Sequence, residues 1–307
     1  MKRFVQRTVA AIGLLVCVIV LLLIVIPKYE DDYLAAYNKK MHLLETISSP
    51  RIIFVGGSNL CFGLDSRRII DSLGLPVINT GLHAGIGLKF LIDDMRPLLR
   101  KGDIVVYAPE YSHFFGSAYG EKATLAPLMD QTNWKKLSIL NARQMWHVVL
   151  GIPDVIRSRL GYITTPQRKD IYRASNINEY GDEVAHWELP SKAIKPDKES
   201  HSNIDKEFGE YFINYLDGLS DSICIVMTPP VIRMTSFKFT ERRASVLSDY
   251  LMEHHYPFNV APVAHALPDS CAYDTSHHMN KSGVDLFTSL LIEELREIVE
   301  TSSVRNE

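Results

Sequence analysis

The sequence predicts an α/β domain in three layers, a parallel sheet covered by helices on both faces, joined to an N-terminal transmembrane helix. Short apolar runs rich in β-branched residues alternate with helical stretches, which is the pattern of βαβ units. These runs are apolar along their whole length, as expected of strands buried on both faces. A further observation, an uncharged apolar run from Val9 to Ile26, predicts the membrane helix.

The uncharged run is long enough to cross a bilayer, because at ~1.5 Å per residue it spans roughly 27 Å against a hydrocarbon core of ~30 Å. Basic residues precede it, within residues 1–8, and acidic residues follow it. This bias predicts a cytoplasmic N-terminus and a main domain in the periplasm or outside the cell. The run is longer than the core of a secretory signal and lacks a small-x-small cleavage site, so we expect a single-pass anchor at residues 9–26.

The composition is that of a globular protein without a nucleic-acid-binding surface. Of 307 residues, 46% are hydrophobic and 22% are charged, enough to bury the core of one large domain or two smaller ones. The 33 basic and 36 acidic residues leave no excess of positive charge to bind nucleic acid. The four cysteines lack C-x-x-C or metal-ligand spacing, and no phosphate or dinucleotide fingerprint is present. We therefore expect no metal, no cofactor and no disulfide framework, with a single disulfide left open.

The domain is expected to span residues 49–307, after a helical stalk over residues 27–48. Its strands are expected at residues 51–57, 76–79, 103–107 and 222–228, with a weaker fifth at 258–261. Its helices are expected at residues 66–73, 84–100 and 281–299. The third and fourth strands are too far apart for a single crossover, so residues of about 115–205 form an insertion, helical at first and then polar loop.

Ser58 is the first candidate catalytic residue. In a doubly wound sheet, ligands bind beyond the carboxyl ends of the strands, and Ser58 follows the first strand and two glycines. Glycine lets the backbone turn tightly, and a hydroxyl at the start of a helix lies near N–H groups that favour negative charge. A serine at such a junction is also a common helix cap, so this residue alone leaves both roles open.

Asp274 and His278 are the candidate partners of Ser58. One helical turn would put both on the same face, where the carboxylate orients the imidazole toward a nucleophile. Serine is a weak nucleophile unless such a base removes its proton. His277 lies three residues after Asp274 and is an alternative base. Asp274 as a helix cap and either histidine as a surface residue are the plain structural alternatives.

Other polar residues near strand ends are candidates for substrate contact. These are Asn79 after the second strand, Glu110 and His113 after the third, and His277 beside His278, together with His186 in the insertion. Polar residues of exposed loops are at least as often plain surface residues, so this group rests on position alone.

Three short motifs resemble blocks of the SGNH/GDSL hydrolase superfamily. GGSN at residues 56–59, NTG at 79–81 and DTSHHMNKSG at 274–283 are similar to its first, second and fifth blocks, in the same order. The resemblance covers residues of about 50–114 and 210–300. It implies the SGNH hydrolase fold, a three-layer domain with a flavodoxin-like parallel sheet.

The resemblance also implies roles for particular residues. Ser58 corresponds to the nucleophile, and its own N–H and that of Gly81 correspond to the donors of the oxyanion hole. Asp274 and His278 correspond to the rest of the triad. The His-apolar-Asn-x-x-Gly spacing that begins at His278 is similar to that of membrane-anchored members associated with surface polysaccharides, which favours His278 over His277.

The third block departs from the family pattern. Its usual asparagine, whose amide completes the oxyanion hole, is absent from residues 107–113, and the Asp-to-His spacing is one residue longer than usual. Loss of one such donor typically costs about 10²–10³ in rate. Asn59 is the candidate substitute.

The function that these features predict is that of a serine-dependent O-acyl (acetyl) esterase or acyltransferase acting on an extracytoplasmic glycan. An acyl donor and a membrane acyl-transfer partner are the partners that this function implies. The alternative is a non-catalytic glycan-binding or assembly protein of polysaccharide biosynthesis with the same fold. The absent asparagine motivates that alternative.

Overall fold

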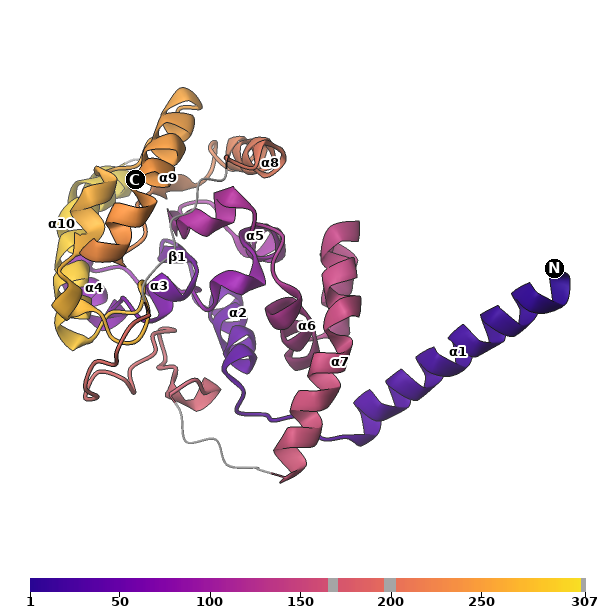
Figure 1. Ribbon diagram of the computed structural model, residues 1–307. Helices are drawn as coiled ribbons and strands as arrows, with labels where there is room; N and C mark the ends of the chain where they lie inside the picture. Colours follow the sequence, from indigo (N-terminus) through magenta and orange to yellow (C-terminus); the bar gives the residue numbers. More distant parts are fainter. Residues whose placement is uncertain (165–170, 196–202, 305–307) are drawn as a thin grey trace.

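A four-stranded parallel sheet forms the centre of the domain, and Figure 1 shows the helices that surround it. The structure, a computed structural model, describes residues 1–164, 171–195 and 203–304. Within these residues the sheet order is β2-β1-β3-β4, and its strands are β1 (Ile52–Gly56), β2 (Val77–Asn79), β3 (Ile104–Ala108) and β4 (Cys224–Met227). The predicted α/β class and parallel sheet are confirmed, and the four main strands lie within two residues of their expected bounds.

Side chains alternate along the strands and build two separate cores. Ile53 of β1 pairs with Ile78 of β2 and Val105 of β3, and all three point into one core. The neighbouring Ile52 points into the other core, because successive side chains of a strand face opposite sides of the sheet. Every residue of β1 is buried. Both faces are therefore covered, which explains why this run is apolar throughout.

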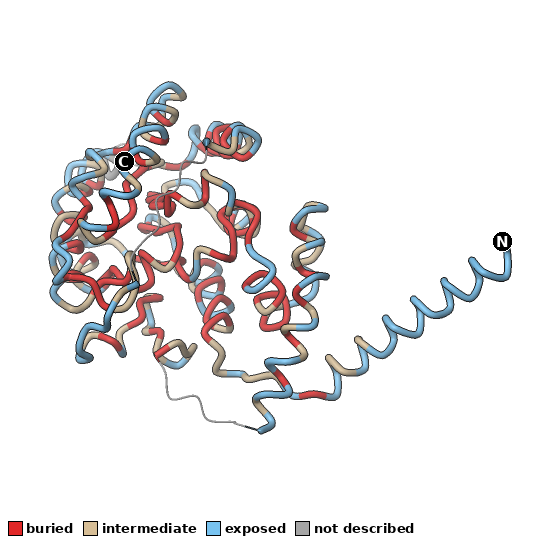
Figure 2. The backbone as a smooth tube through the Cα atoms, in the orientation of Figure 1, coloured by how far each residue is buried: buried red, intermediate tan, exposed pale blue. Residues whose placement is uncertain are grey.

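Helices pack against both faces of the sheet. One core includes residues of α4 (Ser66–Leu73) and α10 (Lys281–Val304). The other, larger core includes residues of α2 (Ala36–Thr46), α5 (Leu88–Met95), α6 (Lys122–Gln131), α8 (Lys206–Asp217) and α9 (Met234–Glu253). Figure 2 shows the buried backbone concentrated around the sheet and on the inner sides of these helices.

Local signals set the ends of the helices that follow the first two strands. Helix α4 has its predicted bounds because Asp65 caps its first turn and Gly74 ends it at a φ of 73°. The helix predicted at residues 84–100 is instead divided. Gly87, at a φ of 86°, precedes α5, and Pro97 lies in the 3-10 turn after it.

The predicted fifth strand is reduced to a single bridge. Of residues 258–261, only Phe258 forms a parallel bridge, to Met227 of β4. The chain then enters the 3-10 turn Pro262–His265, because proline has no N–H to donate to a ladder. Two short strands, β5 (Ile232–Arg233) and β6 (Ala266–Leu267), pair in parallel with each other.

The segment expected as a stalk contributes a helix to the folded domain. In α2, Tyr37 and Met41 lie one turn apart on the same side and are buried in the larger core. Lys40 is also fully buried, and its Nζ donates to the carbonyl of Asn79 at 3.0 Å. The expectation that residues 27–48 form only a stalk is therefore corrected. One side of the helix in this segment is apolar and covers the sheet.

The region expected as an insertion begins with two helices. Helices α6 and α7 (Ala142–Thr164) pack closely, since a Cβ added to Gly151 would lie 2.4 Å from the Cβ of Ala126. The described part of its second half, residues 171–195, consists of loops and one 3-10 turn. Asp182 in this part accepts a hydrogen bond from Asn79 Nδ2 at 2.8 Å, so the loop crosses the end of β2.

An apolar helix at the N-terminus, α1 (Lys2–Val25), projects from the domain (Figures 1 and 2). It contains no buried residue and is long and apolar enough to cross a membrane. A helix of this kind in this place is a membrane anchor or a signal sequence. All four cysteines of the chain are free, so no disulfide constrains the domain.

A buried ion pair joins the two central strands to the end of α2. The guanidinium of Arg51 pairs with the carboxylate of Asp103, through Nε at 3.0 Å and Nη2 at 3.1 Å. Its Nη1 donates to the carbonyls of Leu44 and Ile47, both at 2.6 Å. Both charged side chains are fully buried, so each neutralises a charge that would be costly to bury alone.

Replacing Arg51 with Met should strongly destabilise the fold. The carboxylate of Asp103 would then be buried without its partner, a change that typically costs about 3–5 kcal/mol. The measurement is denaturant unfolding of the full chain in detergent. Arg67→Met is the control, because its pair with Asp71 is solvent-exposed and should contribute little. An equal loss of stability in both variants would contradict this role of Arg51.

Candidate active site

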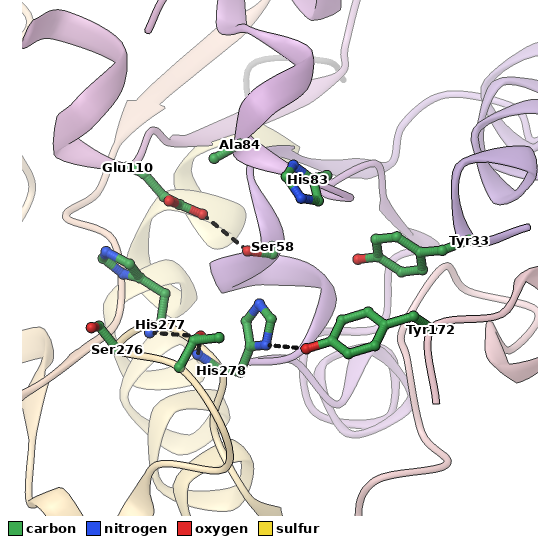
Figure 3. A pocket seen from close by; sticks show the side chains of 10 residues that line it. Tyr33, Ser58, His83, Ala84, Glu110, Tyr172, Ser276, His277 and His278 are labelled. Carbon is green, nitrogen blue, oxygen red and sulfur yellow. Dashed lines mark hydrogen bonds between the residues drawn. The ribbon is translucent and has the colours of Figure 1, made fainter. Parts of the chain in front are cut away.

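A pocket of about 390 Å³ lies at the ends of β1 and β3 (Figure 3). Ser58 follows β1 and Glu110 follows β3, so the pocket has the place where parallel sheets usually bind ligands. The residues that line it are Tyr33, Ser58, His83, Ala84, Glu110, Tyr172, Thr275, Ser276, His277 and His278. The fold thus brings Ser58 and His278, which are far apart in the sequence, to one cavity.

Ser58 is the first residue of α3 (Ser58–Cys61) and is partly exposed. The glycine before it permits a close approach, because a Cβ on Gly57 would lie 2.4 Å from Glu110 Oε1. Ser58 Oγ donates a hydrogen bond to the same Oε1 at 3.2 Å. In the view of Figure 3, Ser58 lies between the carboxylate of Glu110 and the ring of His278.

His278 is held in one orientation by three side chains. Its Nδ1 lies 2.8 Å from Asp274 Oδ1 and, because a carboxylate accepts, this nitrogen carries a proton. Its ring stacks on that of Phe62, with centroids 4.0 Å apart and planes 9° from parallel. Tyr172 donates its hydroxyl to Asp274 Oδ2 at 2.8 Å. The other ring nitrogen, Nε2, is thereby left on the pocket side, where a base for Ser58 is needed.

The contact between Asp274 and His278 arises in a tight loop rather than in the helical turn that their spacing suggested. The residues from Asp274 to His277 form bends. An antiparallel bridge between Ala272 and Met279 closes the loop, and the Tyr273 N–H donates to the His278 carbonyl at 2.7 Å. The backbone therefore brings the two side chains together without a helix.

His277 and His278 have different partners. The Nδ1 of His277 lies 2.7 Å from the carbonyl oxygen of Val231, whereas His278 contacts Asp274. Both rings line the pocket. The geometry therefore favours His278 as the member of an Asp-His pair and leaves His277 as a wall of the pocket.

The pKa of Asp274 is lowered by its neighbours. Burial acts to raise this pKa, but the hydrogen bond and charge of His278 act in the opposite direction, as do the hydrogen bond of Tyr172 and the charge of Lys192, and together they outweigh it. Asp274 is therefore ionised at neutral pH. An ionised carboxylate at this position stabilises positive charge on His278 when the imidazole takes a proton.

Glu110 places a second carboxylate against Ser58. Its Oε1 accepts from Ser58 Oγ and, at 3.4 Å, from the backbone N–H of Asn59. Burial acts to raise the pKa of Glu110, but nearby histidines outweigh burial and lower it. In order of effect these histidines are His277, His113, His278 and His83. An anion therefore occupies the start of α3, where an oxyanion would need stabilisation.

Gly81 and Asn59 were expected to donate hydrogen bonds in the oxyanion hole, but neither the Gly81 N–H nor the Asn59 side-chain amide points into the pocket. The Gly81 N–H donates to Asn79 Oδ1 at 3.0 Å. The side-chain amide of Asn59 donates to the Ala108 carbonyl at 3.1 Å, and its Oδ1 accepts from the Gly57 N–H at 3.1 Å. Gly81 and the Asn59 amide therefore serve the backbone around Ser58, a correction to their expected role.

His83 is a polar residue of the pocket that the sequence analysis missed. Its Nδ1 accepts from the Gly85 N–H at 2.9 Å, so in the neutral ring the proton lies on Nε2. Burial lowers the pKa of His83 despite the opposing charges of Glu110 and Glu121, which keeps the ring neutral. The Nε2–H of His83 is therefore a hydrogen-bond donor on the pocket wall. The sequence signal that could have identified His83 is its position two residues after Gly81, at the end of the second strand.

Three of the expected substrate-contact residues are structural instead. Asn79, His113 and His186 are fully buried and do not line the pocket. Asn79 holds loop 171–195 through Asp182. The Nε2 of His186 contacts the carbonyl of Met279 at 2.7 Å, and that of His113 contacts the carbonyl of Ala84 at 3.1 Å. Glu110 and His277 do line the pocket.

Two tyrosines complete the pocket from regions where no motif was found. Tyr33 follows α1, and Tyr172 lies in the insertion; their rings meet edge to face with centroids 5.6 Å apart. Isolated aromatic residues carry no periodic or spacing signal, so the sequence analysis did not find them. Within the described parts of the chain, no group of three or more His, Cys, Asp or Glu side chains is arranged to hold a metal ion.

Replacing Glu110 with Gln should remove a pH-dependent part of the folding free energy. Because the pKa of Glu110 is lower in the folded protein, the ionised group stabilises the fold above its unfolded pKa of about 4.3, and this contribution is lost as the pH falls through the folded pKa. Urea unfolding of the full chain should therefore show a larger advantage of the wild type over Glu110→Gln at neutral than at strongly acidic pH. A constant difference would contradict the lowered pKa, and the exposed Glu45→Gln variant is the control.

The chain matches no protein-family model, no curated protein and no solved structure. The structure shows an α/β domain with a parallel sheet of order 2-1-3-4 and an N-terminal apolar helix.

Proposed function

We propose that the protein is a serine-dependent O-acyl esterase or acyltransferase of the SGNH type. The observation that carries the proposal is the hydrogen bond between Asp274 and His278 at the wall of a pocket that Ser58 also lines. The sheet order supports it, because flavodoxin-like sheets begin with the order 2-1-3-4 and bind ligands at the same edge. The GGSN, NTG and DTSHHMNKSG motifs all lie at this edge.

The proposed reaction has two steps. His278 takes the proton of Ser58 Oγ, the oxygen attacks the carbonyl carbon of an ester, and His278 returns the proton to the departing alcohol. The acyl group is then bound to Ser58. Water or a sugar hydroxyl gives its proton to His278 and attacks the acyl carbonyl, and the bond between the acyl carbon and Ser58 Oγ breaks. His278 returns the proton to Ser58 Oγ, which restores the free serine. The first acceptor gives hydrolysis and the second gives transfer.

Negative charge on the attacked carbonyl oxygen needs donors, and two are at hand. The Nε2–H of His83 lies on the pocket wall, and the Asn59 N–H currently donates to Glu110. A substrate carbonyl that takes the place of the Glu110 carboxylate would accept from Asn59. In this scheme Glu110 occupies the site until substrate binds, and His83 takes the role of the absent third-block asparagine.

The membrane-proximal position of the pocket supports an extracytoplasmic glycan or a membrane-bound acyl carrier as substrate. We propose that α1 is a single-pass anchor with a cytoplasmic N-terminus and the domain on the opposite side. Tyr33 lines the pocket only eight residues after the end of α1 at Val25. Eight extended residues reach roughly 29 Å at most, so the pocket stands close to the membrane surface.

A second candidate is a non-catalytic protein that binds or assembles glycans. The carboxylate of Glu110 favours it, because an anion bonded to Ser58 and Asn59 blocks the place of an oxyanion. A fold alone does not fix a function. This candidate predicts glycan binding that survives Ser58→Ala and an absence of labelling by serine-reactive probes.

Replacing Ser58 with Ala should abolish both turnover of 4-nitrophenyl acetate and covalent labelling by a fluorophosphonate. The reason is that Ser58 Oγ is the proposed nucleophile. Ser276→Ala removes another hydroxyl from the same pocket and should keep both activities. Labelling that persists in Ser58→Ala, or that disappears equally in both variants, would rule out this mechanism.

Replacing His83 with Ala should lower acetyl-ester turnover about 10²–10³-fold, the usual effect of removing one donor from an oxyanion hole. The fold should persist, and the loss should appear in kcat more than in KM. The exposed His42→Ala variant should turn over ester at the wild-type rate. An unchanged kcat in His83→Ala would exclude His83 as the donor.

A further inference from the structure

Helix α7 has apolar residues on two sides. Val148, Gly151 and Val155 lie on the inner side and are buried, and Gly151 packs against α6. The large apolar side chains exposed on the helix are Trp146, Val149, Leu150, Leu160 and Ile163. At 100° per residue these five share one side of the helix, opposite to the buried residues. A helix on the surface of a soluble domain usually has a polar outer side.

The charges on α7 suit the surface of a bilayer. Asp154 is the only acidic residue in the helix, and it forms an ion pair with Arg157 at 2.6 Å. Arg143 is a further basic residue of the helix, whereas Arg159 is buried on its inner side. Exposed apolar side chains together with exposed basic residues are typical of helices that lie in the interface of membranes with anionic lipids.

The end of α1 is attached to α7. Arg159 Nη1 donates to the carbonyl of Ile26 at 2.6 Å and also to that of Leu23. The same guanidinium pairs with Asp130 of α6, with Nε and Oδ2 3.0 Å apart. The point at which α1 leaves the domain is therefore fastened to the C-terminal half of α7.

The arrangement of the two helices places both on one side of the domain. In Figure 1, α1 leaves the domain on the side of α7 that faces away from the sheet, and Figure 2 shows much of that outer side of α7 as exposed. The rings of Tyr29 and Tyr162 meet beside this junction, with centroids 5.1 Å apart. Tyrosine and tryptophan are enriched where protein meets the membrane–water boundary.

We propose that the outer side of α7 lies in the headgroup region of the bilayer that α1 crosses, as a second membrane contact. The proposal rests on the anchor role proposed above for α1. Helix α1 leaves the domain beside the C-terminal half of α7, so a bilayer around α1 lies next to the exposed apolar side of α7. Two contacts would fix the orientation of the domain and hold the pocket at a constant height above the lipid.

The test uses the tryptophans of the full chain, reconstituted in vesicles of phosphatidylcholine and phosphatidylglycerol. One variant, Trp134→Phe with Trp187→Phe, keeps only Trp146. The matched control, Trp134→Phe with Trp146→Phe, keeps only Trp187, which packs against Lys281 of α10 on the other side of the sheet. Phosphatidylcholine with brominated acyl chains should quench most of the Trp146 emission and leave that of Trp187 nearly unchanged.

The possible results distinguish the anchor role of α1 from the membrane contact of α7. If the full chain does not float with the vesicles, α1 is not an anchor, and both the anchor and the α7 contact are wrong. If the chain floats but Trp146 is quenched by aqueous acrylamide and not by brominated lipid, only the α7 contact is wrong. Protection of Trp146 that is lost on dilution of the protein and is insensitive to brominated lipid would mean that a second copy covers α7. Leu160→Glu, in the outer side of the helix, should reduce the quenching while the chain still floats.

Discussion

The hydrogen bond between Asp274 and His278 is the interaction on which the candidate site depends. It exists because an antiparallel bridge closes the loop that carries both residues. Buried His186 holds that loop by contacting the Met279 carbonyl, and Tyr172 holds the second oxygen of Asp274. Residues of the insertion therefore hold the Asp274–His278 pair in place, whereas Ser58 follows a strand of the sheet. The proposed acyl transfer therefore depends on the contacts that hold this pair in place.

Glu110 gives the site an unusual charge balance. Two ionised carboxylates lie near His278, since Asp274 contacts its Nδ1 and Glu110 lines the same pocket. In the proposed mechanism, these negative charges favour the transfer of the Ser58 proton to the imidazole. Glu110 at the same time opposes negative charge beside the Asn59 N–H. In the proposed mechanism the same residue therefore assists the first proton transfer and opposes the oxyanion until substrate displaces it.

Much of the fold could be predicted from the sequence because its signals are local. The strands are β-branched runs buried on both faces, and α4 has a capping Asp65 and a terminal Gly74. The pairing of Asp274 with His278 was anticipated from spacing, although a loop and not a helix produces it. Tyr33 and Tyr172 could not be predicted, since long-range packing alone brings them to the pocket. The sequence of α2 mixes a polar exposed side with the apolar side that covers the sheet, so its composition alone resembles that of a stalk.

The most direct test of the site is the structure of the full chain after reaction with a serine-reactive phosphonate. We expect phosphorus bonded to Ser58 Oγ and His278 Nε2 within hydrogen-bond reach of that oxygen. We also expect a phosphonyl oxygen, in place of the Glu110 carboxylate, to accept from the Asn59 N–H. A structure with phosphonate on another residue, or with Glu110 still bonded to Asn59 beside a modified Ser58, would contradict this view of the site.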